Sequence, residues 1–153
     1  MKIGDYFNSL DIIPDLASTT KEEVLAELTA KLVTHHNTFD RDEVFRVLME
    51  RELLGSTGIG YGIAIPHAKL RYRGDPIIVF GRSMTGIPYD ALDGKPVNLI
   101  FLLLAGEHDL ELYLKLLARI SRFLKDRAFR GRLMDVAGAD ALYDTIREQD
   151  NRL

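Results

Sequence analysis

One apolar segment near the centre of the chain restricts the fold more than any other feature of the sequence. Residues 97–105 read VNLIFLLLA, and every residue in this segment except Asn98 is apolar. A run without polar alternation is typical of a β-strand that is buried on both faces. It is far too short to span a bilayer, which requires about 20 apolar residues in a helix. We therefore expect a strand inside a sheet that helices cover.

Segments with helical periodicity alternate with short apolar runs along the rest of the chain. Thr20 and Asp40 each precede an acidic first turn and apolar residues at helical spacing, so they are predicted N-caps. We predict strands at 63–65, 76–82 and 97–105, and helices that begin near residues 21, 41, 110, 128 and 139. This order indicates an α/β fold with helices covering a central sheet. Without a repeat or a linker, residues 1–153 are expected to form one domain.

The composition argues against several classes of protein. A net charge of −3 and a pI near 5.8 disfavour nucleic-acid binding, which usually requires a basic surface. The chain has no cysteine, which is compatible with a reducing compartment. Residues 1–15 contain one lysine and lack the apolar core of a signal peptide. We therefore expect a cytoplasmic protein with no membrane insertion and no nucleic-acid partner.

A glycine-rich stretch leads to a histidine at the expected end of a strand. Residues 55–69 read GSTGIGYGIAIPHAK and contain four of the twelve glycines of the chain. Glycine lets the backbone turn sharply and approach other groups closely, while Pro66 ends the predicted strand and keeps Ile65 extended. His67 is thereby expected on a stiff connection, where reactive side chains are often held. A structural histidine at a strand end is the alternative.

The groups expected around His67 suit phosphoryl transfer. A neutral imidazole is a good nucleophile toward phosphorus when one ring nitrogen is free and an acceptor holds the proton of the other. Arg51 is expected in the last turn of the preceding helix, where its guanidinium can bind phosphoryl oxygens in a bidentate manner. The hydroxyl groups of Ser56 and Thr57 are further candidate donors. The predicted site therefore combines a nucleophile with charged and neutral donors.

Other ligand-binding motifs are weak or absent. The pattern G-x-G-x-G follows a predicted helix and precedes a strand, which is the reverse of the order in a dinucleotide-binding fold. No G-K-[ST] phosphate-binding loop occurs. His35 and His36 are adjacent, a poor spacing for two metal ligands on one helix, and are interpreted as a solvated helix end. We therefore expect neither a metal site nor a cofactor.

The central motif has a counterpart in a known family. Arg51 and Glu52, followed by GSTGIG-x-GIAIPH at 55–67, closely resemble the IIA domain of the bacterial phosphoenolpyruvate-dependent sugar phosphotransferase system (PTS). The similarity is to the fructose/mannitol class, which includes the nitrogen-regulatory IIA proteins, and it extends over almost the whole chain. It implies a mixed central sheet flanked by helices on both faces. It also implies that His67 accepts a phosphoryl group from a histidine phosphocarrier protein, with Arg51 as the active-site arginine.

The chain departs from this family at a second histidine. The family usually carries that histidine at the start of the helix after the long buried strand, beside the phosphorylated one. Aligning the following L-x-x-L-x-x-I pattern puts Tyr113 at that position, while His108 lies five residues earlier in the predicted loop. Phosphorylation of His67 is still expected, with Tyr113 and His108 as candidate supporting residues, but onward transfer to another protein is left open.

These features lead to one main functional interpretation and two alternatives. The resemblance favours a phosphotransferase that carries the phosphoryl group on a histidine. We interpret it as a nitrogen-type regulator that binds regulatory target proteins according to its phosphorylation state. The first alternative is a sugar-specific, fructose-type IIA component that passes phosphate to a IIB protein in sugar transport. The second is a binding module that has lost phosphoryl transfer.

Overall fold

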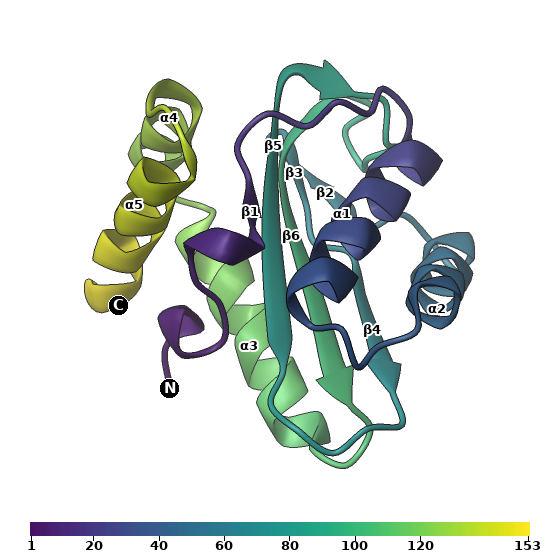
Figure 1. The fold of residues 1–153 in the computed structure, drawn as a ribbon. Coiled ribbons are helices and arrows are strands. Elements are labelled where there is room, and N and C mark those ends of the chain that lie inside the picture. The colour runs from purple at the N-terminus through teal and green to yellow at the C-terminus, as the bar shows by residue number, and fades with distance from the viewer.

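A computed structural model describes residues 1–153 and contains five α-helices packed around one six-stranded sheet (Figure 1). The N-terminal segment consists of two 3-10 turns, η1 (Ile3–Asp5) and η2 (Ser9–Asp11), and strand β1 (Ile12–Ile13). The other strands are β2 (Gly58–Gly60), β3 (Ile63–Ala64), β4 (His67–Leu70), β5 (Ile77–Ile87) and β6 (Val97–Gly106). The helices are α1 (Lys21–His35), α2 (Arg41–Leu53), α3 (Leu110–Phe123), α4 (Arg127–Asp135) and α5 (Ala139–Asn151).

The sheet is mixed, and β6 lies at its centre. The strand order is β1-β5-β6-β3-β2, and β4 also pairs with β6. β5 runs antiparallel to β6, whereas β3 and β4 run parallel to it. The register is constant from Ile63 opposite Leu99 to His67 opposite Leu103, so β3 and β4 form one interrupted strand. The predicted fold, a mixed sheet within an α/β domain, is confirmed.

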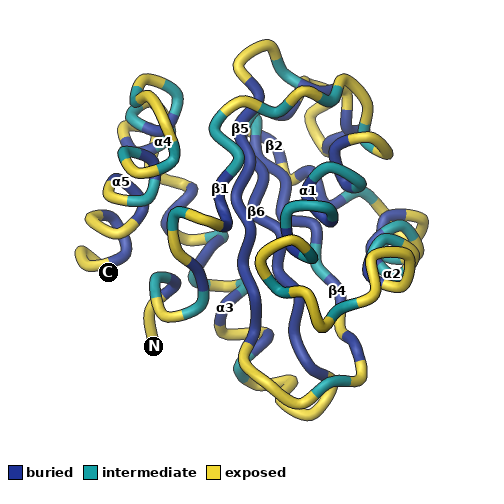
Figure 2. Tube along the Cα trace, viewed as in Figure 1, coloured by how far each residue is buried: buried dark blue, intermediate teal, exposed yellow.

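Alternate residues of the central strands enter two apolar cores, one on each face of the sheet. In β6, Phe101 and Leu103 join the core formed with α3, α4 and α5, while Ile100 and Leu102 join the core formed with α1 and α2. Successive side chains of a strand point to opposite faces, which explains why residues 97–105 lack polar alternation. Helices cover both faces, and the sheet is the most deeply buried layer (Figure 2).

Two helices begin at the side chains that were predicted as caps, since Thr20 caps α1 and Asp40 caps α2. Asp109 caps α3 in the same way, and each of these three side chains accepts a backbone N–H of the first turn. Each cap contributes about 1 kcal/mol to helix stability. None of the helices combines the length and the apolar composition that crossing a bilayer requires.

Two local features differ from the sequence interpretation. The strand predicted over 76–82 continues as β5 to Ile87, because Ile87 pairs with Val97 after a shift of register. The helix end at His35 and His36 is partly exposed, as predicted, but both imidazole rings also contact the buried carboxylate of Asp11.

Candidate functional site

His67 is the first residue of β4, at the point where the strand beside β6 resumes after Pro66. We predicted His67 just after a strand end, and it instead begins a strand. The interruption has a simple cause, because proline lacks the N–H that a neighbouring strand would accept. The N–H of Leu103 donates to the carbonyl oxygen of Pro66 at 2.9 Å, so the backbone is fixed directly before the histidine.

The backbone also selects one tautomer of the His67 ring. Nδ1 lies 2.7 Å from the carbonyl oxygen of Ile65. A carbonyl oxygen can only accept, so Nδ1 carries the proton and donates it. The other nitrogen, Nε2, then holds the free lone pair. This is the arrangement that a nucleophilic imidazole requires.

The surroundings keep this imidazole neutral. Burial lowers the pKa of His67 below its ordinary value of 6.5, and the positive charge of Arg51 lowers the pKa further. The hydrogen bond to Ile65 and the charge of Glu52 act in the opposite direction without reversing the shift. The ring is therefore uncharged at neutral pH, and its Nε2 is available for reaction.

Tyr113 packs beside His67, on the face of the sheet that α3 covers. The neighbouring β4 residues Ala68 and Leu70 enter the core on the α1–α2 side, so His67 and Lys69 point to the opposite face. The Tyr113 ring lies 5.9 Å from the His67 ring, and Lys69 Nζ lies 5.6 Å from the centroid of the tyrosine. Burial raises the pKa of Tyr113 to about 12, so its hydroxyl is neutral at neutral pH.

Arg51 lies in the last turn of α2, as predicted. Its guanidinium donates to the carbonyl oxygen of Gly55 at 2.9 Å and thereby holds the start of the glycine-rich stretch. The same positive charge lowers the pKa of His67 and also opposes the upward shift of the Tyr113 pKa. The charge of Arg51 thus acts on both His67 and Tyr113, although the three residues come from α2, β4 and α3.

A buried carboxylate organises the glycine-rich stretch. Glu52 is 7% exposed, and it accepts both the hydroxyl and the backbone N–H of Thr57. It also accepts the hydroxyl of Tyr89 at 3.2 Å and pairs with Lys21 Nζ at 3.1 Å. The hydroxyl of Ser56 donates to the carbonyl oxygen of Tyr89 at 3.0 Å. The two hydroxyls predicted as phosphoryl donors are thus engaged within the protein, where they hold the stretch in place.

The sequence carries one signal for this network. Glu52 lies in the last turn of α2, where the helix dipole disfavours a negative charge. An acidic residue at that position therefore needs compensation elsewhere in the structure. Lys21 and Tyr89 supply it, but they are 31 and 37 residues away in the chain, so no local pattern identifies them.

His108 does not lie beside His67. It packs against Gly106, which pairs with Leu70, three residues beyond His67 and about 10 Å farther along the strand. There it lines a shallow hollow with Glu107 and residues 71–73. The structure therefore brings His67, Arg51 and Tyr113 together and leaves His108 outside this group.

The arrangement around His67 is suited to accepting a group that carries negatively charged oxygens. The lone pair of Nε2 can form the new bond while the proton stays on Nδ1, which donates it to the carbonyl oxygen of Ile65. The guanidinium of Arg51 can neutralise the incoming charge, and the phenol of Tyr113 can add a neutral hydrogen bond. These features match the chemistry of phosphoryl transfer to histidine.

Known proteins share both the sequence and the fold. Residues 5–149 match the family model described as "Phosphoenolpyruvate-dependent sugar phosphotransferase system, EIIA 2". The chain is 40% identical over 146 residues to the nitrogen regulatory protein of Bradyrhizobium diazoefficiens, an alignment that covers 95% of each chain. It is 37% identical over 150 residues to the PTS system fructose-specific EIIABC component of Bacillus subtilis. That alignment covers 98% of this chain but only 24% of the longer relative.

A solved structure agrees with these relatives. The crystal structure of nitrogen regulatory protein IIA-Ntr from Neisseria meningitidis superposes with a TM-score of 0.88 and 31% sequence identity. The superposition covers 94% of this chain and 98% of that one. The helices on both faces and the mixed sheet between them are therefore a shared architecture.

Proposed function

The chain belongs to the PTS EIIA type 2 family, whose domains are phosphoryl carriers in a phosphotransferase cascade, and from that premise we propose that it accepts a phosphoryl group on Nε2 of His67. The donor is the phosphohistidine of a histidine phosphocarrier protein. The bond between phosphorus and the donor nitrogen breaks, and its electron pair returns to the donor ring. The lone pair of Nε2 forms the new bond, while the proton stays on Nδ1.

The hydrogen bond from Nδ1 to the carbonyl oxygen of Ile65 is the single observation that carries this proposal. It leaves Nε2 as the free nucleophile and keeps the other nitrogen protonated after transfer. The transferred phosphoryl group carries about two negative charges near neutral pH, while the ring, which keeps its Nδ1 proton, carries one positive charge. We assign the main stabilisation of the phosphoryl charge to Arg51, and a weaker, neutral contribution to Tyr113.

The remaining candidate residues act indirectly in this proposal. Thr57 and Ser56 fix the glycine-rich stretch through Glu52 and Tyr89. The carbonyl oxygen of Thr57 also accepts the N–H of Ile65 at 3.0 Å, which ties this stretch to the residue that holds the His67 ring. His108 contributes nothing to the phosphoryl group, because it lies at the far end of β4. The active residues are thus His67 and Arg51, with Tyr113 in support.

We further propose that the protein is a regulator of the nitrogen type. The alignment with the nitrogen regulatory protein of Bradyrhizobium covers 95% of both chains, which supports the same role for this chain. PTS IIA proteins also interact with IIB components. The fructose-specific relative therefore supports the alternative, in which the phosphoryl group passes to a IIB protein. We also propose that the protein meets its phosphocarrier donor in the cytoplasm.

A phosphorylation assay tests the proposal. The chain is incubated with labelled phosphoenolpyruvate, enzyme I and the histidine phosphocarrier protein. The wild type should acquire one acid-labile phosphoryl group per chain, and His67→Ala should acquire none. His108→Ala is the matched control and should be labelled like the wild type. Undiminished labelling of a folded His67→Ala protein would overturn the assignment.

Adding IIB proteins to the same assay distinguishes the functional alternatives. Addition of fructose-type IIB proteins should leave the label on the wild type if the chain is a nitrogen-type regulator. Rapid loss of label to a IIB protein would favour the sugar-specific alternative. Failure of the wild type to acquire any label would favour the binding module without phosphoryl transfer.

A further inference from the structure

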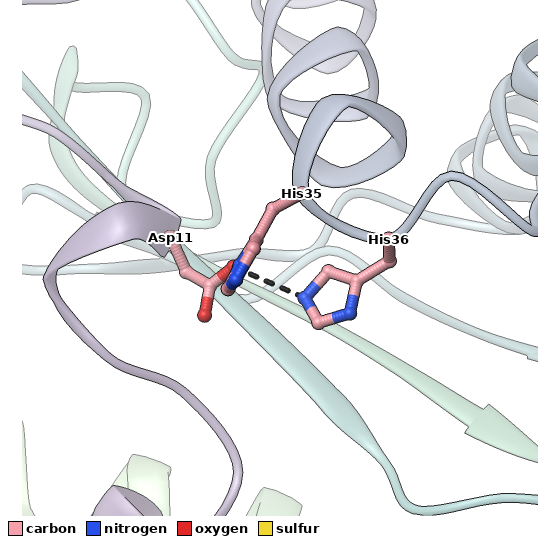
Figure 3. Close-up of side chains that lie close together, drawn as sticks. All are labelled: Asp11, His35 and His36. Carbon is pink, nitrogen blue, oxygen red and sulfur yellow. Dashed lines mark hydrogen bonds and ion pairs between the residues drawn. The ribbon is translucent and has the colours of Figure 1, made fainter.

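Three side chains that could ligate a metal converge at the end of α1, among the residues of a cavity that His67 does not line. His35 Nδ1 lies 2.6 Å from Oδ1 of Asp11, and His36 Nε2 lies 3.1 Å from the same oxygen. Figure 3 shows Asp11 on the N-terminal segment and both imidazoles reaching toward it from the helix end. All three ligand atoms lie within 4.8 Å of one another.

The end of the helix explains how adjacent histidines converge. Consecutive side chains on an α-helix point about 100° apart, which made the pair a poor candidate from sequence. His35 is the last helical residue, however, and His36 has φ −119° and ψ 74°, which is not helical. The change of backbone direction brings the two rings to 4.5 Å between centroids. Adjacent positions in the sequence therefore do not prevent His35 and His36 from facing the same carboxylate.

The geometry points to a binding site for a divalent transition-metal ion, with Asp11, His35 and His36 as ligands, and we propose zinc as its occupant. Imidazole and carboxylate together suit Zn²⁺, which binds them at about 2.0–2.2 Å in a tetrahedron. Ligand atoms in such a site lie about 3.3 Å apart. The His36 distance of 3.1 Å already approaches this value, and the His35 distance of 2.6 Å needs to open by less than about 1 Å.

The Asp11 carboxylate is fixed by a backbone hydrogen bond to one oxygen, as is common for carboxylates that bind metal ions. Asp11 is 1% exposed, and Asn8 N–H donates to Oδ2 at 3.1 Å, which leaves Oδ1 to face the imidazoles. Both of its ion-pair partners are histidines, so no permanent cation balances this buried charge. A bound divalent ion would supply the missing positive charge. Hydrogen bonds to ligating carboxylates are a regular feature of metal sites.

The cluster is also accessible. The His35 and His36 side chains are 29% and 27% exposed, and all three ligands line a cavity of about 570 Å³. The cavity provides a path for the ion and room for water at the fourth position of the tetrahedron. A bound ion would connect η2, which leads into β1, to the end of α1. It would therefore stabilise the N-terminal segment against the rest of the fold.

Calorimetric titration with Zn²⁺ alone tests the proposal, with Co²⁺ as a spectroscopic substitute. The chain has four histidines and no cysteine, so a His67→Ala/His108→Ala double variant retains only His35 and His36. This variant should bind one Zn²⁺ with the affinity of the wild type, and Co²⁺ should give the absorption of a tetrahedral site. Absence of binding, or loss of the site in the double variant, would overturn the proposal.

Single substitutions distinguish a metal site from a clamp made only of hydrogen bonds. His35→Gln and His36→Gln should each weaken Zn²⁺ binding at least about tenfold, since even outer-shell changes cost 10–100-fold. Excess Zn²⁺, about 100 times the wild-type Kd, should raise the unfolding midpoint of the wild type by about 5–10 °C and that of each variant by no more than about half as much. Variants that are less stable yet keep the full Zn²⁺-dependent rise would identify the cluster as a hydrogen-bonded clamp and overturn the site.

Discussion

Protonation of His67 decides whether its ring can attack phosphorus. Burial and Arg51 lower the pKa of His67, so the rate of phosphorylation should fall with decreasing pH at a lower pH than the ordinary histidine pKa of 6.5 would give. As the pH falls, this histidine takes up its proton near pH 6.5 in the unfolded chain and only at a lower pH in the folded chain. The stability that His67 contributes is therefore present above pH 6.5 and is lost as the pH falls through the folded pKa. A pH–rate profile and pH-dependent unfolding measure both effects.

Two variants serve as controls for this pH dependence. Arg51→Gln removes a charge that lowers the pKa of His67, so the pKa should rise. Glu52→Gln removes a charge that raises it, so the pKa should fall. NMR titration of the His67 ring protons in each protein measures the direction. A shift in the same direction in both variants would contradict the proposed electrostatics.

Tyr113 should limit the lifetime of phosphorylated His67. Its hydroxyl is neutral, because burial raises its pKa to about 12, and charge-assisted hydrogen bonds are about twice as strong as neutral ones. Tyr113→His should therefore lengthen the hydrolysis half-life of the phosphoprotein, while Tyr113→Phe should shorten it. His108→Ala should have no effect. If phosphorylation collapsed in His108→Ala and Tyr113→Phe were silent, the supporting role would belong to His108.

At the residue scale, the sequence predicted the positions of those site residues whose backbone is set by their neighbours in the chain. Arg51 at a helix end and His67 after Pro66 could be placed because neighbouring residues set their backbone. The network of Glu52 and Tyr89 could not, since it joins residues far apart in the chain. The convergence of His36 with His35 could not be predicted for a different reason, because His36 lies one residue beyond the end of the helix and helical spacing does not apply to it.

At the scale of elements, the glycine-rich stretch depends on close packing at Gly58. A Cβ at this position would lie 2.8 Å from Ala91 Cβ, nearer than real Cβ atoms approach. Gly58→Ala should therefore destabilise the protein by about 1–3 kcal/mol. Gly131→Ala is the matched control, since a Cβ there meets no atom within 4 Å inside α4, and it should stabilise by about 0.5–1 kcal/mol. Denaturant unfolding measures both, and equal effects would refute the packing argument.

Strand and helix positions were predictable to different degrees. The starts of α1 and α2 were predictable because Thr20 and Asp40 each lie directly before an apolar pattern of helical spacing. The extension of β5 to Ile87 was missed, because it depends on pairing with Val97 across a shifted register. Because the tertiary fold sets which strands pair, the ends of a strand are harder to predict from the sequence than its presence.

At the scale of the whole molecule, the sheet joins two cores that lie on its opposite faces. One core holds Leu116 of α3 and the other holds Leu48 of α2, and both side chains are fully buried. The Arg82 guanidinium of β5 also donates to the carbonyl oxygens of Pro14 and Leu133, each at 2.9 Å. Elements from both ends of the chain are thus connected through the central strands, which favours cooperative unfolding of one domain.

This arrangement predicts that damage to either core destabilises the entire fold. Leu48→Ala and Leu116→Ala should each lower the free energy of unfolding by about 2–5 kcal/mol. Because β6 belongs to both cores, each variant should still unfold in one transition that far-ultraviolet circular dichroism and tyrosine fluorescence report at the same denaturant concentration. If Leu48→Ala shifted one of two separate transitions and Leu116→Ala shifted the other, the two faces of the sheet would unfold independently. The 153 residues would then not behave as one domain.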